Sequence, residues 1–230
     1  MLHAMRLQTS LLFGLVALVV GPAAAQTASP TTAQPAADSG TFVIRRAGDT
    51  VATERFARTA TTLQGTLDLR NARNTSQAYK AVIAPDASVP LIEVTVRESL
   101  DSGRVKGKVV QQARVVFKED SVAVDDVNGG GMQTRVFSSE RGAVPYLNLS
   151  FGLLEQAVRR SRASAPGSAR VPLFNLGGGQ TLDAKVSPLG ADSLALAIGS
   201  VEFHLRVDPA GRVLGGRIPS QGVVADRVGS

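Results

Sequence analysis

The chain has 230 residues, a formal net charge of +6 and no cysteine. The absence of cysteine excludes a disulfide framework, a lipid-modified cysteine and any thiolate metal site. The arginines are scattered and aromatic residues make up only 4% of the chain, so the aromatic stacking platform of a nucleic-acid-binding protein is not expected.

The first 25 residues have the pattern of a secretory signal peptide. Arg6 is their only charged residue, an apolar run extends from Leu11 to Val20, and the segment ends in Ala23-Ala24-Ala25. This order of regions is typical of a cleaved signal, and the run is shorter than the roughly 20 residues that span a bilayer. We therefore expect cleavage after Ala25, a periplasmic or secreted location, and no stable membrane span in the mature chain.

Residues 26–39 are rich in Pro, Ala, Thr and Ser and lack large apolar side chains. Such a segment cannot bury enough surface to offset its ordering entropy, which predicts a disordered linker. Residues 40–230 then form a single β-rich domain. A second compositional break at residues 160–170 predicts a surface loop within it.

Apolar and polar residues alternate along most of the chain after Gly40, which is typical of strands with one buried face. Residues 41–58 predict a hairpin around a Gly-Asp turn, and Ile92, Val94 and Val96 predict the buried face of a later strand. About ten strands are expected, with residues 104–119 divided between two of them. This pattern indicates a mainly β fold, namely a curved antiparallel sheet in the form of a half-barrel or open barrel, with a sandwich as the alternative.

One segment, residues 150–162, interrupts the alternation. Phe151, Leu154 and Val158 recur at helical spacing, Ser150 is a good N-cap, and arginines stand near the carboxyl end, where the helix dipole favours cations. This predicts one amphipathic helix that covers the sheet. The same three apolar residues are the predicted ligand contacts, and ordinary core packing is the alternative for them.

A serine hydrolase is a weaker alternative. Ser150 opens a helix as in a nucleophile elbow, and Asp183 or Asp192 and then His204 follow in the chain order of that class. However, Asn148 replaces the first glycine of the motif, and the alternating βα units are absent. His204 is the only histidine left after signal cleavage, so a multi-histidine zinc site is excluded, and we expect it to be an exposed strand residue.

Two other polar patterns fall short of a site. Asp38 and Asp101 each begin an Asp-Ser-Gly sequence, as in aspartic proteases, but neither follows the apolar residues that would embed it in a core. Asp126 and Asn128 resemble the start of a calcium loop, yet the twelfth position is Phe137 instead of glutamate. A hairpin turn is the preferred interpretation there, and no metal or cofactor is expected.

The glycine-rich segment 207–222 lacks the helix that would complete a phosphate-binding loop. Asp208–Gly211 predicts a turn, and Gly215 and Gly216 predict a bulge or sharp bend in a following strand.

Three stretches carry a resemblance to a known group of proteins. "GTFVIRRAGDTVATERF", "LLEQAVRRSR" and "VEFHLRVDPAGRVLGGRIPSQGVVADR" resemble a family of exported, uncharacterised bacterial β-rich proteins. In architecture the chain is similar to the periplasmic lipoprotein-carrier half-barrels, in which a curved antiparallel sheet covered by helix holds lipid. It departs from them in having one convincing helix.

We therefore expect an exported, non-enzymatic protein that binds an apolar ligand, lipid or lipoprotein, between sheet and helix. The resemblance assigns no functional residues, and the predicted contacts Phe151, Leu154 and Val158 come from the apolar face of the predicted helix. One alternative is an envelope structural or protein-interaction module that contacts protein partners through exposed edge strands. A hydrolase of the aspartic or serine type is the second.

Overall fold

The computed structural model describes residues 38–70, 74–98, 107–164 and 169–229. The predicted signal peptide, residues 26–37 of the predicted linker and the Asp-Ser-Gly sequence at Asp101 lie outside these residues. The first strand begins at Asp38, two residues before the predicted start of the domain.

Fifteen strands, one α-helix and one short 3-10 helix are present in the described part of the chain. The strands are β1 (Asp38–Arg46), β2 (Asp49–Arg58), β3 (Thr62–Leu69), β4 (Thr75–Val82), β5 (Leu91–Glu98), β6 (Val109–Phe117), β7 (Ser121–Asn128), β8 (Gly131–Ser138), β9 (Val144–Tyr146), β10 (Ala169–Asn175), β11 (Gln180–Pro188), β12 (Ser193–Ile198), β13 (Val201–Val207), β14 (Val213–Ile218) and β15 (Val223–Val228). The helices are α1 (Phe151–Ser164) and η1 (Pro219–Gln221).

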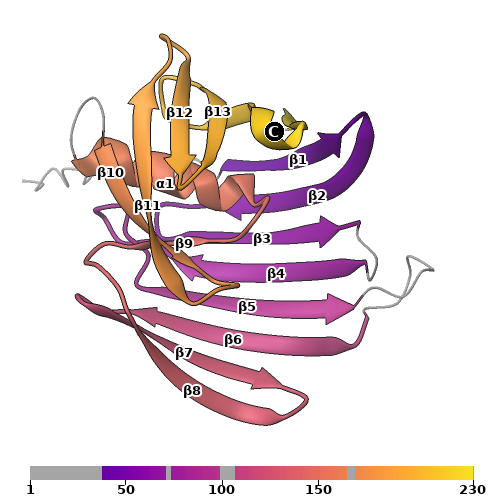
Figure 1. Cartoon of the computed structure of the whole chain (residues 1–230), viewed down its shortest axis with the longest axis vertical. Helices are drawn as coiled ribbons and strands as arrows, with labels where there is room; N and C mark the ends of the chain where they lie inside the picture. The colour runs from indigo at the N-terminus through magenta and orange to yellow at the C-terminus, as the bar shows by residue number, and fades with distance from the viewer. Residues whose placement is uncertain (1–37, 71–73, 99–106, 165–168, 230) are drawn as a thin grey trace, which may run out of the picture. The chain divides into compact units, whose positions relative to one another are not determined.

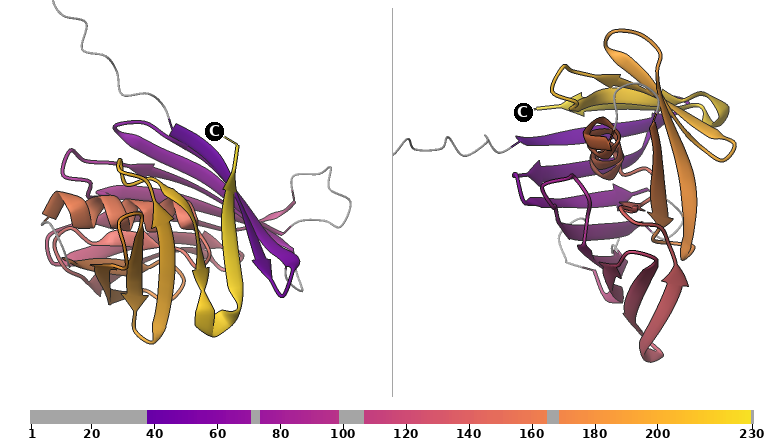
Figure 2. Two further views of the ribbon diagram at one scale, coloured as in Figure 1. Left: turned by 90° about the horizontal axis from the view of Figure 1, so that it is seen from above. Right: turned by 90° about the vertical axis from the view of Figure 1, so that its left-hand side faces the viewer.

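All the strands belong to one sheet, in the order β8-β7-β6-β5-β4-β3-β2-β1-β15-β14-β13-β12-β11-β10-β9. Neighbours are antiparallel except β9 and β10, which are parallel and connected through α1. The sheet curves so that β10–β13 stand in front of the long strands, with α1 between the two parts (Figures 1 and 2). It does not close, because β8 and β9 remain its two ends. The predicted curved antiparallel sheet with a single helix is confirmed.

Several local predictions are also confirmed. Residues 41–58 form the β1–β2 hairpin, whose turn residues Ala47 and Gly48 both have positive φ, 50° and 91°, as a tight hairpin turn requires. Residues 208–211 form a turn in which the Gly211 N–H donates to the carbonyl of Asp208 at 2.9 Å.

The predicted count of about ten strands is too low, since fifteen are present in the described part of the chain. Two strand boundaries also differ from the prediction. Residues 109–117, divided between two predicted strands, form the single strand β6, because Gln111 and Gln112 continue the extended backbone where a break was expected. The short strand β9 was not predicted at all. Three residues that include a proline carry no alternation, and only the parallel pairing with β10 defines them as a strand.

The helix begins as predicted, since the Ser150 hydroxyl accepts a hydrogen bond from the Leu153 N–H at 3.3 Å. It continues to Ser164, and β10 begins at Ala169, so the surface loop predicted at residues 160–170 is wrong for residues 160–164 and 169–170. The helix packs on the inside of the curved sheet. The ring centroids of Phe151 and Phe42 are 5.4 Å apart, and the Phe42 ring stacks on that of Phe56 with a centroid distance of 5.5 Å.

Candidate ligand-binding cavity

The three predicted ligand contacts lie in the hydrophobic core. Phe151, Leu154 and Val158 are each no more than 1% exposed, and they pack against buried side chains of the sheet. The space between these side chains and the sheet is therefore filled by protein. Their role as ligand contacts stays a prediction, and a cavity has to be sought elsewhere on the inner face.

The amino end of α1 is attached to the sheet by a buried carboxylate. Glu54 of β2 accepts hydrogen bonds from the Tyr79 hydroxyl at 2.7 Å, the Ser150 hydroxyl at 2.5 Å and the Gly152 N–H at 2.9 Å. Complete burial raises the pKa of Glu54 above its usual value, against the opposing effect of these hydrogen bonds. A carboxyl group at a helix amino terminus also satisfies N–H groups that have no partner within the helix.

Glycine makes this close approach of helix and sheet feasible. A Cβ atom on Gly65 of β3 would collide with the Tyr79 ring and lie 2.9 Å from the carbonyl oxygen of Arg55. A Cβ on Gly152 would lie 2.7 Å from the Tyr79 hydroxyl. The two glycines thus leave room for the aromatic ring that reaches Glu54.

The middle of α1 is held by a second buried carboxylate. Glu155 is fully buried and lies 3.2 Å from the Arg58 Nε of β2, 3.0 Å from the Arg159 Nε and 3.6 Å from an Arg227 nitrogen of β15. It also accepts the Val213 N–H of β14 at 2.9 Å. One side chain therefore joins the helix to three strands, which come from both ends of the sequence.

Beyond the helix, the inner face of β4–β7 retains a cavity of about 120 Å³. Figure 1 shows α1 beside β1 and β2, with β5–β8 farther along the sheet. The cavity is lined mainly by short apolar side chains of these strands and closed from the other side by residues that follow β9 and β10. The lining apolar residues are Val94, Val96, Ala113, Val115, Val124, Leu147 and Leu176.

Polar side chains gather along one part of this cavity. Gln77 Oε1 is buried and has no hydrogen-bond partner among the described residues. Gln111 donates to Asp126 at 3.0 Å, and Arg135 lies 3.6 Å from the same carboxylate. The cavity therefore combines an apolar wall with one unused hydrogen-bond acceptor.

Sequence reasoning missed this site, although a signal for it exists. Gln77, Gln111 and Asp126 occupy inward positions in strands whose other inward residues are apolar, such as Tyr79, Val115 and Val124. A polar residue in an inward register is costly to bury without a partner. It therefore indicates either a polar network or a ligand contact.

A larger hollow of about 550 Å³ lies on the outer face of β13–β15, above Gly216. Gly215 and Gly216 occupy a stretch of β14 where the register shifts, as predicted. The backbone of neighbouring strands lies close: a Cβ on Gly215 would be 2.6 Å from the Ala225 carbonyl oxygen. The rim is charged, with Arg206 paired to Asp226 at 3.2 Å. This hollow is more open to solvent than the inner cavity, which is walled on two sides, although its floor is also largely apolar.

The serine-hydrolase residues are not brought together. The Ser150 hydroxyl is buried against Glu54. His204 lies on the outer face of β13, where it contacts Glu202 at 2.5 Å and Arg217 at 3.3 Å. Asp183 pairs with Arg170 at 2.5 Å.

The other polar patterns occupy structural positions. Asp38 of β1 pairs with Arg227 at 2.5 Å, and Asp126 and Asn128 end β7 at the predicted hairpin turn. No cluster of three or more metal-ligating side chains occurs in the described ranges.

Two solved structures resemble the described fold. The chain shares its fold with a DUF1089-family protein of Pseudomonas aeruginosa. The TM-score is 0.53 at 15% identity, and the match covers 74% of this chain and 90% of the other. A β-barrel-like protein of the DUF1849 domain of unknown function from Brucella abortus aligns with a TM-score of 0.48 and 10% identity, over 83% and 96% of the two chains.

The likeness to the DUF1089-family protein concerns the fold alone, and it agrees with the predicted resemblance to uncharacterised β-rich proteins. No family model matches the sequence, and no curated protein matches it. Among the described residues, no helix is both long and apolar enough to cross a membrane.

Proposed function

We propose that this is an exported, non-enzymatic binding protein that takes an apolar chain or ring into the cavity on the inner face of β4–β7. The observation that carries the proposal is the cavity itself, with seven apolar side chains and one unpaired buried acceptor in its wall. Ligand pockets commonly combine a mostly apolar lining with a few polar groups that orient the ligand.

The size of the cavity limits the ligand. A dry cavity of about 150 Å³ holds a molecule the size of benzene, so a space of about 120 Å³ accommodates one ring or the end of an alkyl chain. The remainder of a longer lipid would lie outside. Each buried methylene group contributes about 0.8 kcal/mol, which gives affinity to a chain end without any charged contact.

The polar wall favours a particular head group. Arg135 is already engaged by Asp126, whereas Gln77 Oε1 lacks a donor among the described residues. A ligand hydroxyl or amide N–H beside the apolar chain would satisfy that oxygen. The preferred ligand is accordingly an uncharged amphiphile with a hydrogen-bond donor, such as a fatty alcohol or an amide-linked acyl chain.

Lipid extraction and native mass spectrometry of the purified protein, followed by titration with a fluorescent alkyl probe, test the proposal. Ala113→Phe fills the cavity from β6 and is expected to abolish probe binding. Gln112→Phe is the matched control, because this neighbouring residue is exposed on the opposite face of the same strand. Equal binding by the two variants, or no binding by the unmodified protein, would refute the proposal.

A further inference from the structure

The two ends of the sheet differ in how they are protected against pairing with another strand. β9 has three residues, with Val144 and Pro145 buried. A short edge strand with proline is a common protection. β8 at the other end has eight residues, Gly131–Ser138, and Figure 1 shows it at the lower margin of the sheet. An edge of this length offers a template for a further strand.

The outward side chains of β8 are apolar or uncharged. Met132 is 71% exposed and Val136 is 69% exposed, more than any other large apolar side chain in the described ranges. Thr134 stands between them and donates to Asp125 of β7 at 2.8 Å. Edge strands are commonly protected by lysine, proline or an inward-pointing charge; β8 has no lysine or proline, and its one charged residue, Arg135, is paired with Asp126 at 3.6 Å.

The register with β7 identifies the backbone groups at the free edge. Asn128 pairs with Gly131 at the tight turn, and hydrogen-bonded pairs alternate from there, so Gln133 and Arg135 bond to β7. The N–H and C=O groups of Met132, Thr134 and Val136 therefore point away from β7. The same three residues carry both the exposed side chains and backbone groups that have no partner in the described part of the chain.

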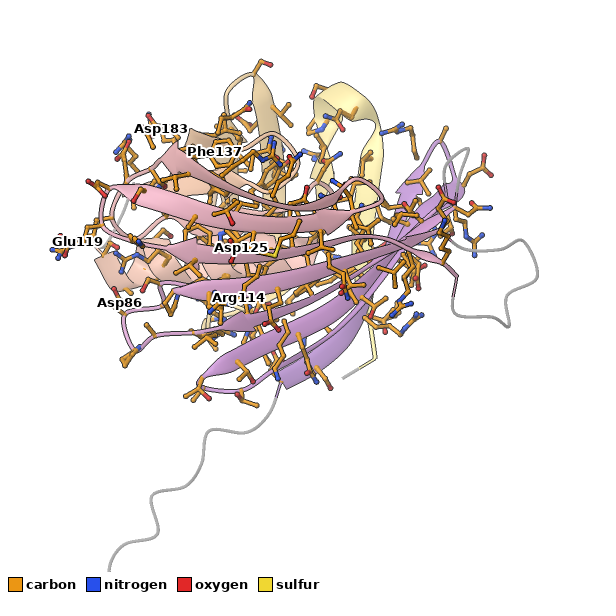
Figure 3. All side chains as sticks on the ribbon, turned by 90° about the horizontal axis from the view of Figure 1, so that it is seen from below. Asp86, Arg114, Glu119, Asp125, Phe137 and Asp183 are labelled. Atoms are coloured by element: carbon orange, nitrogen blue, oxygen red, sulfur yellow. The ribbon has the colours of Figure 1, made fainter. Side chains whose placement is uncertain are left out.

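The far end of β8 is covered by the opposite arm of the sheet. Thr181 of β11 donates to the Ser138 carbonyl at 3.3 Å, and the Phe137 ring lies 5.7 Å from that of Phe174. Figure 3 shows Phe137 on the side of the sheet where Asp183 of β11 lies. The stretch available for pairing is therefore residues 131–136.

We propose that residues 132–136 of β8 form an antiparallel pair with the same strand of a second copy of this chain, with the two-fold axis at Thr134. In this register Thr134 faces Thr134, and Met132 of each copy faces Val136 of the other. Each N–H of these three residues at the free edge then meets a C=O of the other copy. The two most exposed apolar side chains, Met132 and Val136, cover each other across the pair. In a symmetric antiparallel pair each residue faces the residue at the same distance on the other side of Thr134. The sequence of β8 suits this arrangement, because an apolar residue faces an apolar residue and threonine faces threonine.

Charge also permits self-pairing. On the inner face Arg135 of one copy would lie opposite Gln133 of the other, which can accept a hydrogen bond from it. Arg135 is neutralised within its own chain by Asp126 at 3.6 Å. No like charges stand directly opposite, an arrangement that would be destabilising in an antiparallel pair.

Pairing through one short strand buries less surface than a standard protein interface, so the dimer is expected to be weak and concentration-dependent. Sedimentation equilibrium of the purified full chain over a range of concentrations measures it. The expected result is a mass that rises from monomer toward dimer, with no larger species, because the pairing is closed by its two-fold axis.

Three variants test the site. Thr134→Pro removes the central outward N–H without breaking the ladder to β7 and is expected to abolish the dimer. Thr134→Val keeps that N–H, loses only the hydroxyl and is expected to retain the dimer. Val136→Lys places like charges at the edge and is expected to weaken association at least about tenfold. Val224→Lys on the outer face of β15, 47% exposed, is the control and leaves association unchanged. Circular dichroism of each variant checks folding.

A cysteine substitution tests the register directly, because the chain has no cysteine of its own. Thr134→Cys places two thiols about 5 Å apart across the axis, so a short bifunctional thiol reagent is expected to join the dimer efficiently, whereas Val224→Cys is not joined. The proposal is overturned by a monomer at every concentration, by a dimer that survives both Thr134→Pro and Val136→Lys, or by a different polypeptide found paired with β8.

Discussion

Replacing Glu155 by alanine is expected to destabilise the fold more than any surface change. Glu155 is fully buried, and its carboxylate faces Arg58 and Arg227, which are also buried. Removing one partner of a buried ion pair costs about 3–5 kcal/mol, because the remaining charge is left uncompensated. The Val213 N–H would lose its acceptor as well. The loss is a large part of the 5–15 kcal/mol that stabilises a typical domain.

Urea unfolding measures this effect. With an m-value of about 2 kcal/mol per M, a loss of about 4 kcal/mol lowers the midpoint by about 2 M. Glu155→Gln is expected to lose less, because its amide oxygen can still accept one of these hydrogen bonds. Glu119→Ala is the control, since its pair with Arg141 is solvent-exposed and such pairs contribute little.

A second variant separates the ion pair from packing. Arg58→Met combined with Glu155→Met removes the buried charge on β2 together with its partner, and we expect it to recover part of the stability lost in Glu155→Ala. A loss below about 1 kcal/mol in Glu155→Ala would contradict the argument, because it would mean that Arg58 and Arg227 are hydrated or otherwise compensated in solution.

Three further predictions follow from the inner face. Gly65→Ala should destabilise the protein by about 1–3 kcal/mol in urea unfolding, because its methyl group collides with Tyr79, whereas Gly177→Ala, with no contact under 3.6 Å, should not. Since burial raises the pKa of Glu54 above 4.5, the unfolded chain ionises first as the pH rises, and stability should fall from pH 4.5 toward the folded pKa. Glu54→Gln should remove that slope, and an unchanged pH profile would contradict the assignment. For a series of alkyl alcohols, calorimetry should show affinity rising about fourfold per methylene group and levelling off once the cavity is full; a rise that continues along the whole series would contradict the cavity's limit.

Much of the local structure follows from the sequence, for identifiable reasons. Alternation of apolar and polar residues shows which side of each strand is buried, since successive side chains point to opposite faces. Ile92 and Val94 are buried as that pattern predicts. Ser150 identifies the start of the helix, and the glycines at 215 and 216 identify the irregular strand, because capping and backbone clearance are local requirements.

The candidate site did not follow from the same reasoning. Phe151, Leu154 and Val158 form the apolar face of the only predicted helix, but periodicity cannot show whether such a face meets a ligand or a filled core. The cavity lies farther along the sheet, beside Gln77 and Ala113. Its position depends on which strands α1 leaves uncovered.

By itself, then, the sequence determined the mainly β class, the hairpins, the single helix and the burial of each strand's faces. Only the tertiary structure decided that β1 pairs with β15, that Glu155 joins the helix to both ends of the chain, and that β8 and β9 remain as edges. The physical reason is that alternation specifies the orientation of a side chain relative to its own strand, whereas strand order and the path of the helix depend on contacts between residues far apart in the sequence.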